Sequence, residues 1–180
     1  GFFPVMMFGL PAAAFAMYQE AKPERKQQIA SLMLAGAVTS FVTGVTEPLE
    51  FAFMFVAPLL YGVHAVLTGL SLFIASMFHW TAGFGFSAGL IDFSLTSGMP
   101  MANNPFMLLV SGLGFAVVYY LLFKVLIKMF KLKTPGREEE DNEEELKIEA
   151  SNSNHAEVAA VIYEALGGKD NVVSIDNCAT

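Results

Sequence analysis

Cations are missing from most of the apolar part of this sequence. No lysine or arginine lies between Lys26 and Lys124, and only 15% of the 180 residues are charged, against about a quarter in a soluble domain. Hydrophobic residues make up 54% of the chain. These proportions exclude an ordinary soluble domain and predict a membrane protein. The net charge of −7 comes mainly from an acidic run at residues 137–149, and it indicates no nucleic acid partner.

Cysteine is almost absent, because Cys178 is the only one. A single thiol cannot form an internal disulfide, and beside a polar stretch it fits a reducing cytosol. The spacings typical of zinc ligands, of a phosphate-binding glycine loop and of a Ser/His/Asp arrangement are also missing, so we expect no bound metal and no bound cofactor. The sequence begins in an apolar run without methionine, and we therefore expect a fragment of a longer protein.

Four apolar stretches predict helices. Residues 1–18, interrupted by prolines and rich in alanine, predict a kinked helix packed closely against others. Residues 28–44 are barely long enough for the ~30 Å hydrocarbon core at about 1.5 Å per residue. Residues 59–78 and 106–129 predict full spans. The basic residues that follow the last span place its end in the cytoplasm by the positive-inside rule.

Two further stretches are too short or too interrupted for straight spans. Residues 45–58, between Gly44 and Pro58, predict a re-entrant hairpin. Residues 81–98, rich in glycine and serine, predict a second re-entrant or cavity-lining segment. Irregular backbone at membrane depth must be enclosed by protein or line a water-filled space. These stretches are therefore where we expect a substrate site.

The pattern changes after the last span. Residues 134–151 read as an acidic flexible linker, because they cannot bury enough apolar surface to fold. A helix at 155–166, a glycine stop and a strand at 172–175 follow. The sequence predicts an α-helical polytopic membrane protein with re-entrant hairpins over residues 1–133, followed from residue 152 to 180 by the start of a small soluble α/β domain.

Two carboxylates flank a proline in the apolar region, Glu47 and Glu50 around Pro48. Residues three apart share a face of a helical turn, although Pro48 argues against a regular helix here. A carboxylate in lipid is costly, so at least one should contact an interhelical partner or a ligand hydroxyl. Without a basic partner nearby, we favour a sugar hydroxyl. Asp92 is a further candidate, with capping of a re-entrant helix as an equal alternative.

Other reactive side chains have plainer interpretations. His64 and His79 lie within or at the end of the third span, and we interpret them as satisfied interior histidines. Cys178 comes just after the predicted strand, where α/β folds expose reactive groups. A lone cysteine is nevertheless more often inert, because thiolate character depends on basic neighbours.

Five stretches carry a resemblance that covers nearly the whole chain in order. Among them are Thr46-Glu47-Pro48-Leu49-Glu50 and Asp176-Asn177-Cys178; the five are residues 1–11, 44–51, 86–92, 132–137 and 175–180. Together they resemble the glucose superfamily of sugar permeases of the bacterial phosphoenolpyruvate-dependent phosphotransferase system. The resemblance implies the C-terminal part of the membrane-spanning C component, joined to the start of the B domain.

The resemblance also implies roles for individual residues. Cys178 would accept a phosphoryl group, derived from phosphoenolpyruvate, from a phosphohistidine on the A component and pass it to the 6-hydroxyl of the sugar. Glu47 would bind sugar hydroxyls, and we take Thr46, Glu50 and Asp92 as further candidates for substrate binding. The family implies a homodimer in the bacterial inner membrane, with the linker and B domain in the cytoplasm.

The substrate is less sharply indicated. Residues 1–8, Ala88 within residues 86–89, and the stretch 149–154 look more like the N-acetylglucosamine branch, whereas residues 22–24 and 91–93 look more like glucose permeases. We favour N-acetylglucosamine over glucose. An ion-coupled sugar carrier, with Glu47 or Asp92 relaying protons, is an alternative of another class, and a membrane sugar sensor is a third.

Overall fold

The computed structural model describes residues 1–137, which form helices joined by short connections. Most of the predicted linker and all of the predicted α/β domain lie outside the described residues. Within residues 1–137 the only strand pairing is an isolated bridge between Thr81 and Asn103. In order, the elements are the π-helix η1 (Pro4–Gly9), α1 (Leu10–Glu20), the 3₁₀ turn η2 (Pro23–Arg25), α2 (Lys26–Thr43), α3 (Glu47–Met54), α4 (Pro58–Met77), α5 (Leu90–Thr96) and α6 (Phe106–Phe130).

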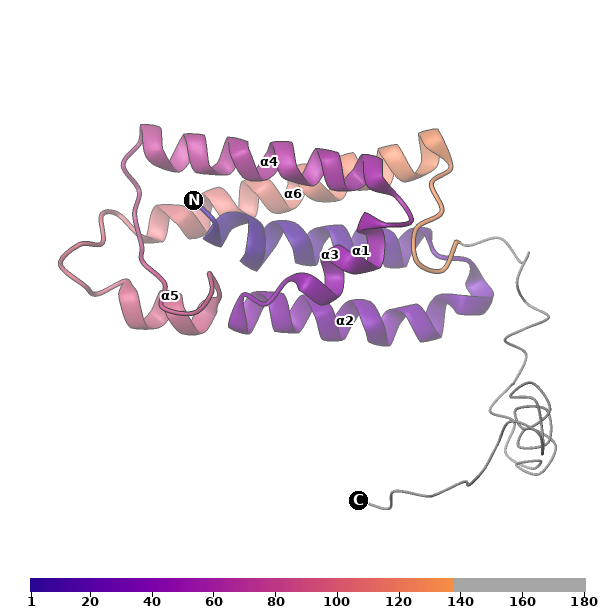
Figure 1. Cartoon of the computed structure of the whole chain (residues 1–180), viewed down its shortest axis with the longest axis horizontal. Helices are drawn as coiled ribbons and strands as arrows, with labels where there is room; N and C mark the ends of the chain where they lie inside the picture. Colours follow the sequence, from indigo (N-terminus) through magenta and orange to yellow (C-terminus); the bar gives the residue numbers. More distant parts are fainter. Residues whose placement is uncertain (138–180) are drawn as a thin grey trace, which may run out of the picture. The chain divides into compact units, whose positions relative to one another are not determined.

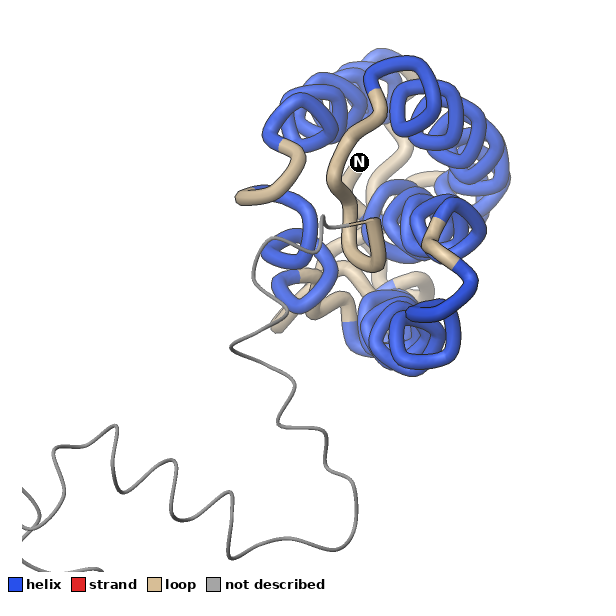
Figure 2. The backbone as a smooth tube through the Cα atoms, turned by 90° about the vertical axis from the view of Figure 1, so that its right-hand side faces the viewer, coloured by secondary structure: helices blue, strands red, loops and turns tan. Residues whose placement is uncertain are grey.

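Four long helices lie side by side. Figure 1 shows α1 and α6 running in one direction and α2 and α4 in the other. The end-on view in Figure 2 shows the same helices as separate coils. Helix α1 packs against both α2 and α6, and η1 extends the contact with α6. The predicted helices at 28–44, 59–78 and 106–129 are therefore confirmed as α2, α4 and α6.

Two helices of the described region are long and apolar enough to cross a membrane. They are α4, with 20 residues and a mean hydropathy of 1.7, and α6, with 25 residues and a mean hydropathy of 2.2. Their outward faces leave large apolar side chains exposed, including Val66, Phe73 and Leu113. Such faces suit contact with lipid or with further protein rather than with water.

Small residues allow the helices to approach closely, as the sequence predicts. Ala13, Ala14 and Ala16 of α1 are buried. A Cβ atom added at Gly9 would lie 2.8 Å from the ring of Tyr119 on α6. The predicted kink of the first helix takes the form of the π-helix η1, in which the N–H of Leu10 bonds to the carbonyl of Val5.

The predicted re-entrant hairpin at residues 45–58 is wrong in form. The structure has one short helix, α3, instead of two arms. Because α2 and α4 begin at the same end of the bundle and run in the same direction, α3 and its flanking turns lead the chain back along it (Figure 1). Gly44 ends α2 with φ 79°, and Pro48 lies in the first turn of α3, where its missing N–H costs no helical hydrogen bond. Pro48 thus begins a helix rather than breaking one.

The connection between α4 and α6, which contains the second irregular stretch, begins and ends at the same place in the fold. Thr81 and Asn103 exchange two backbone hydrogen bonds of 2.9 and 3.0 Å, which join the end of α4 to the approach to α6. The loop and α5 between them therefore form an excursion whose ends meet. This geometry agrees with the re-entrant or cavity-lining segment predicted at residues 81–98.

The start of the predicted linker is packed against the helices. Residues 134–136 are buried, and the carbonyl of Gly136 accepts a hydrogen bond of 3.0 Å from the N–H of Lys22. The guanidinium of Arg137 donates to the carbonyl of Glu20 at 3.0 Å. The linker boundary predicted at residue 134 therefore falls within the packed part of the chain.

A close backbone contact joins α2 to the excursion. A Cβ atom at Gly44 would lie 2.6 Å from the backbone nitrogen of Gly89, and one at Gly89 would collide with the backbone of Thr43 and Gly44. The hydroxyl of Ser87 donates to the carbonyl of Gly44 at 2.7 Å. Neither backbone can yield as a side chain could, so both positions require glycine.

We predict that Gly89→Ala destabilises the protein by about 1–3 kcal/mol, the usual cost of overpacking a filled site. The matched control is Gly83→Ala in the same loop, because a Cβ atom at Gly83 meets nothing within 4 Å. Thermal unfolding of both variants in detergent checks the prediction. Equal unfolding temperatures for the two variants would contradict the tight contact.

Candidate functional site

The structure brings together two stretches that the sequence singles out separately. The segment after Gly44 carries Thr46, Glu47 and Glu50, and the Ser87–Gly89 turn leads into α5 with Asp92. The contact between Gly44 and Gly89 places these two stretches next to each other. All the predicted substrate-binding residues therefore come from two adjoining segments.

Glu47 is the open carboxylate of the group. It is the first residue of α3 and is exposed, and within residues 1–137 its side chain has no hydrogen-bond or ion-pair partner. Pro48 beside it is exposed, and so is Phe51 one turn further along the helix. A carboxylate next to an exposed aromatic ring can accept hydrogen bonds from hydroxyl groups while the ring covers an apolar surface.

Glu50 points to a different environment. One carboxylate oxygen, Oε1, lies 3.5 Å from Nε2 of His64 on α4, and the Glu50 side chain is only 21% exposed. The two glutamates of α3 therefore do not act as a pair, although they are three residues apart. Glu50, predicted as a substrate-binding residue, has a partner inside the protein.

His64 connects Glu50 to a buried tyrosine. Its other ring nitrogen, Nδ1, lies 3.0 Å from the hydroxyl of Tyr119 on α6, and both side chains are buried. The rings of Phe53 and Phe123 pack around the pair, with Phe53 edge-on to His64 and Phe123 stacked on Tyr119. The prediction of a satisfied interior histidine is confirmed for His64, whereas His79 is exposed.

Asp92 binds backbone rather than another side chain. Its carboxylate accepts N–H groups from Gly85 at 2.7 Å, Ser87 at 3.1 Å and Phe86 at 3.4 Å. Asp92 is buried, so these bonds hold the loop before α5 in its curved course. The N–H groups belong to the loop before α5 and not to the first turn of that helix, so Asp92 shapes the loop rather than capping the helix. Its predicted role in substrate binding stays a prediction.

Thr46 is the N-cap residue of α3 and is buried. Its carbonyl accepts the N–H groups of Leu49 and Glu50, each at 3.0 Å. The role visible for Thr46 is therefore to start the helix that carries Glu47. Cys178 lies outside the described residues, and its predicted role stays a prediction.

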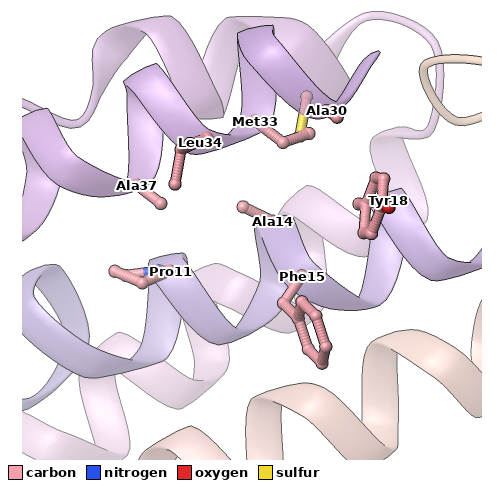
Figure 3. A pocket seen from close by; sticks show the side chains of 8 residues that line it. All are labelled: Pro11, Ala14, Phe15, Tyr18, Ala30, Met33, Leu34 and Ala37. Atoms are coloured by element: carbon pink, nitrogen blue, oxygen red, sulfur yellow. The ribbon is translucent and has the colours of Figure 1, made fainter. Parts of the chain in front are cut away.

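Two cavities of the described region have apolar walls and differ in kind from this site. One, of about 290 Å³, lies between α1 and α2, and Figure 3 shows Phe15 and Met33 among its lining side chains. The other, of about 430 Å³, runs along α4 from Pro58 to Leu67 and reaches Leu122. A sugar needs several hydrogen-bonding groups, so neither wall suits it. Within residues 1–137, no three His, Cys, Asp or Glu side chains lie close enough together to hold a metal ion.

The sequence analysis did not predict that His64 contacts both Glu50 and Tyr119. A signal was present, because the cation-free stretch contains three acids, Glu47, Glu50 and Asp92. His64 shares the buried face of α4 with Leu60 and Leu67. A histidine among buried apolar residues needs a polar partner, and few are available in this stretch.

Comparison with known proteins agrees with the predicted family in both parts of the chain. Residues 1–69 match the family model described as "Phosphotransferase system, EIIC", and residues 160–180 match the one described as "phosphotransferase system, EIIB". The whole chain is 53% identical to an N-acetylglucosamine-specific EIICBA component of Escherichia coli and covers 28% of it. It is 51% identical to an N-acetylglucosamine-specific EIICB component of Bacillus subtilis and covers 39% of it.

A glucose-specific EIICBA component of Staphylococcus carnosus is 48% identical over the whole chain, which covers 26% of that relative. The chain thus spans between about a quarter and two fifths of the length of these relatives. A membrane C part and a B part follow one another in it as they do in the relatives' names. The chain therefore belongs to the EIIC and EIIB components of the bacterial phosphotransferase system, and N-acetylglucosamine-specific components are among its relatives at 51% and 53% identity.

Proposed function

We propose that the complete protein takes up N-acetylglucosamine and phosphorylates it at the 6-hydroxyl, with phosphoenolpyruvate as the ultimate phosphoryl donor. The observation that carries the proposal is the full-length similarity to N-acetylglucosamine-specific components, with a C part and a B part in one chain. Glu47 binds sugar hydroxyls in the C part. Cys178 carries the phosphoryl group in the B part.

The open carboxylate of Glu47 supports its role. Of the three acids in the cation-free stretch, Asp92 already accepts three backbone N–H groups and Glu50 faces His64. Only Glu47 keeps free acceptor oxygens on an exposed face of α3. Hydrogen bonds from sugar hydroxyls to a carboxylate are charge-assisted and stronger than neutral ones.

The chemistry divides one difficult transfer into two. The thiolate of Cys178 attacks the phosphorus of a phosphohistidine on the A component, forming the S–P bond as the N–P bond breaks. The sugar 6-hydroxyl then attacks that phosphorus, losing its proton to solvent, and the S–P bond breaks to regenerate the thiolate. A thiolate is both a good nucleophile and a good leaving group, which makes each step easier than direct transfer.

The A component, which supplies the phosphohistidine, is the protein partner, and the working unit is a homodimer in the bacterial inner membrane. The basic end of α6 and the B part face the cytoplasm. Phosphorylation there traps the sugar, because the apolar barrier rejects its new charge. The names of the three relatives, which join C, B and in two cases A components, support the A component as a partner.

Glucose is the second candidate substrate, favoured by the 48% identity to a glucose-specific component. An ion-coupled carrier has less support, because such a carrier needs no phosphoryl-carrying domain like the B part matched at residues 160–180.

We predict that vesicles containing the complete protein, the A component and a phosphoenolpyruvate-driven donor system convert radiolabelled N-acetylglucosamine to its 6-phosphate faster than glucose. The measurement is the phosphorylated product formed from each sugar at equal concentration. Faster glucose phosphorylation would reverse the substrate assignment. Release of unmodified sugar, abolished when the proton gradient collapses, would support the ion-coupled carrier instead.

We predict that Glu47→Gln weakens sugar binding about tenfold or more, because a hydrogen bond to a charged acceptor contributes about 1.5–3 kcal/mol and 1.4 kcal/mol is tenfold. Phosphorylation of Cys178 by the A component should be unchanged, since it does not use the sugar site. Equilibrium binding of labelled N-acetylglucosamine checks this. Glu24→Gln, at an exposed position outside the candidate site, is the matched control. Equal affinity in both variants would remove Glu47 from the sugar site.

We predict that Cys178→Ser abolishes sugar phosphorylation and leaves sugar binding to the membrane part intact. A serine hydroxyl is not ionised at neutral pH and cannot replace the thiolate as nucleophile. Phosphotransfer assays and binding assays on the same preparation check the two halves of the prediction. Retained phosphorylation, or parallel loss of binding, would contradict a separate relay at Cys178.

A further inference from the structure

The side chain of His64 links three helices and has no part in the chemistry proposed above. It faces Glu50 of α3 with one ring nitrogen and Tyr119 of α6 with the other, at 3.5 and 3.0 Å, and lies itself on α4. His64 and Tyr119 are 7% and 0% exposed. A polar group so deeply buried costs stability unless it is hydrogen-bonded, and each of these has the other as a partner.

The two contacts are consistent with one protonation arrangement. When the Tyr119 hydroxyl donates to Nδ1, the single proton of a neutral imidazole is on Nε2 and points toward the carboxylate of Glu50. Tyr119 thereby orients the ring, while the carboxylate of Glu50, which can only accept when ionised, favours the tautomer with its proton on Nε2. The ring in turn presents a donor to Glu50.

Helix α3 depends on such contacts for its position. It has eight residues, and an isolated helix of that length is unstable in water. Leu49 packs against Gly36 of α2, and Phe53 is fully buried in the core, so both anchor the inner side of α3. Glu50 adds a polar anchor directed at His64, on the side of α4.

The rotation of α3 about its own axis decides where Glu47 points. Residues three apart on a helix differ in direction by about 60°, so a rotation that removes Glu50 from His64 also moves Glu47. We propose that His64 is a positioning residue for the sugar site, which holds Glu50 and thereby directs the Glu47 carboxylate toward the sugar. This inference rests on the proposed role of Glu47 in sugar binding.

Two substitutions separate the two contacts of His64. A glutamine side chain places its amide near the position of Nε2, so it retains a hydrogen-bond donor for Glu50. An asparagine side chain places its amide near the position of Nδ1, so it retains only a hydrogen-bond partner for the Tyr119 hydroxyl. In the complete protein we expect His64→Asn to raise the KM for N-acetylglucosamine about tenfold, the usual scale for losing a hydrogen bond to a charged group, with kcat little changed. His64→Gln should remain close to the unsubstituted protein.

The matched control is His79→Asn. His79 is exposed at the end of α4 with a φ of 56°, a conformation that asparagine adopts readily. Its KM should be unchanged. Phosphorylation of Cys178 by the A component, measured on every variant, reports whether each protein is folded and active in the part that does not bind sugar.

The double variant Glu47→Gln with His64→Asn tests whether His64 acts through Glu47. If it does, the double variant has the KM of Glu47→Gln alone, because there is no longer a carboxylate to direct. A merely structural role would make the two effects multiply. Multiplied effects, or equal KM values for His64→Asn and His64→Gln, would overturn the inference. A normal KM for Glu47→Gln alone would instead remove the proposed sugar-binding role on which it rests.

Discussion

The organisation of this region follows from the need to satisfy acids in a stretch that has no lysine or arginine. A carboxylate between Lys26 and Lys124 has no lysine or arginine near it in sequence, so backbone N–H groups, histidine or a ligand are the partners closest at hand. Asp92 takes three backbone N–H groups, and Glu50 takes the imidazole of His64. Among residues 1–137, Glu47 is the one of these three acids whose side chain has no partner. The scarcity of cations in this stretch thus leads each of its three acids to a different environment.

The position of that acid depends on a contact between two backbones. Gly44 ends α2 in a left-handed conformation and lies against Gly89, and the hydroxyl of Ser87 bonds to the carbonyl of Gly44. The loop that Asp92 shapes is therefore fixed to the residue that precedes Thr46 and Glu47. The bonds that Asp92 makes to the backbone therefore help to hold the neighbouring segment in place.

Much of the helical framework could be predicted from sequence, because periodicity and length act locally. Helices α2, α4 and α6 and the excursion between α4 and α6 are where apolar runs, glycines and prolines indicate them. The form of residues 45–58 could not be predicted in this way. A proline in an apolar run either breaks a helix or begins one, and Pro48 begins one because Gly44 has already turned the chain.

The sequence could predict which residues form the candidate site. It could not predict which partner each acid meets, because that depends on how the helices pack in the tertiary structure. Sequence spacing places Glu47 and Glu50 on neighbouring faces of one turn but contains no information on which face meets α4. That choice is made by Leu49 and Phe53, whose burial fixes the inner side of α3. Once they are buried, Glu50 comes within reach of His64 and Glu47 remains on the open face. The packing of two apolar side chains therefore places two identical acids in different environments.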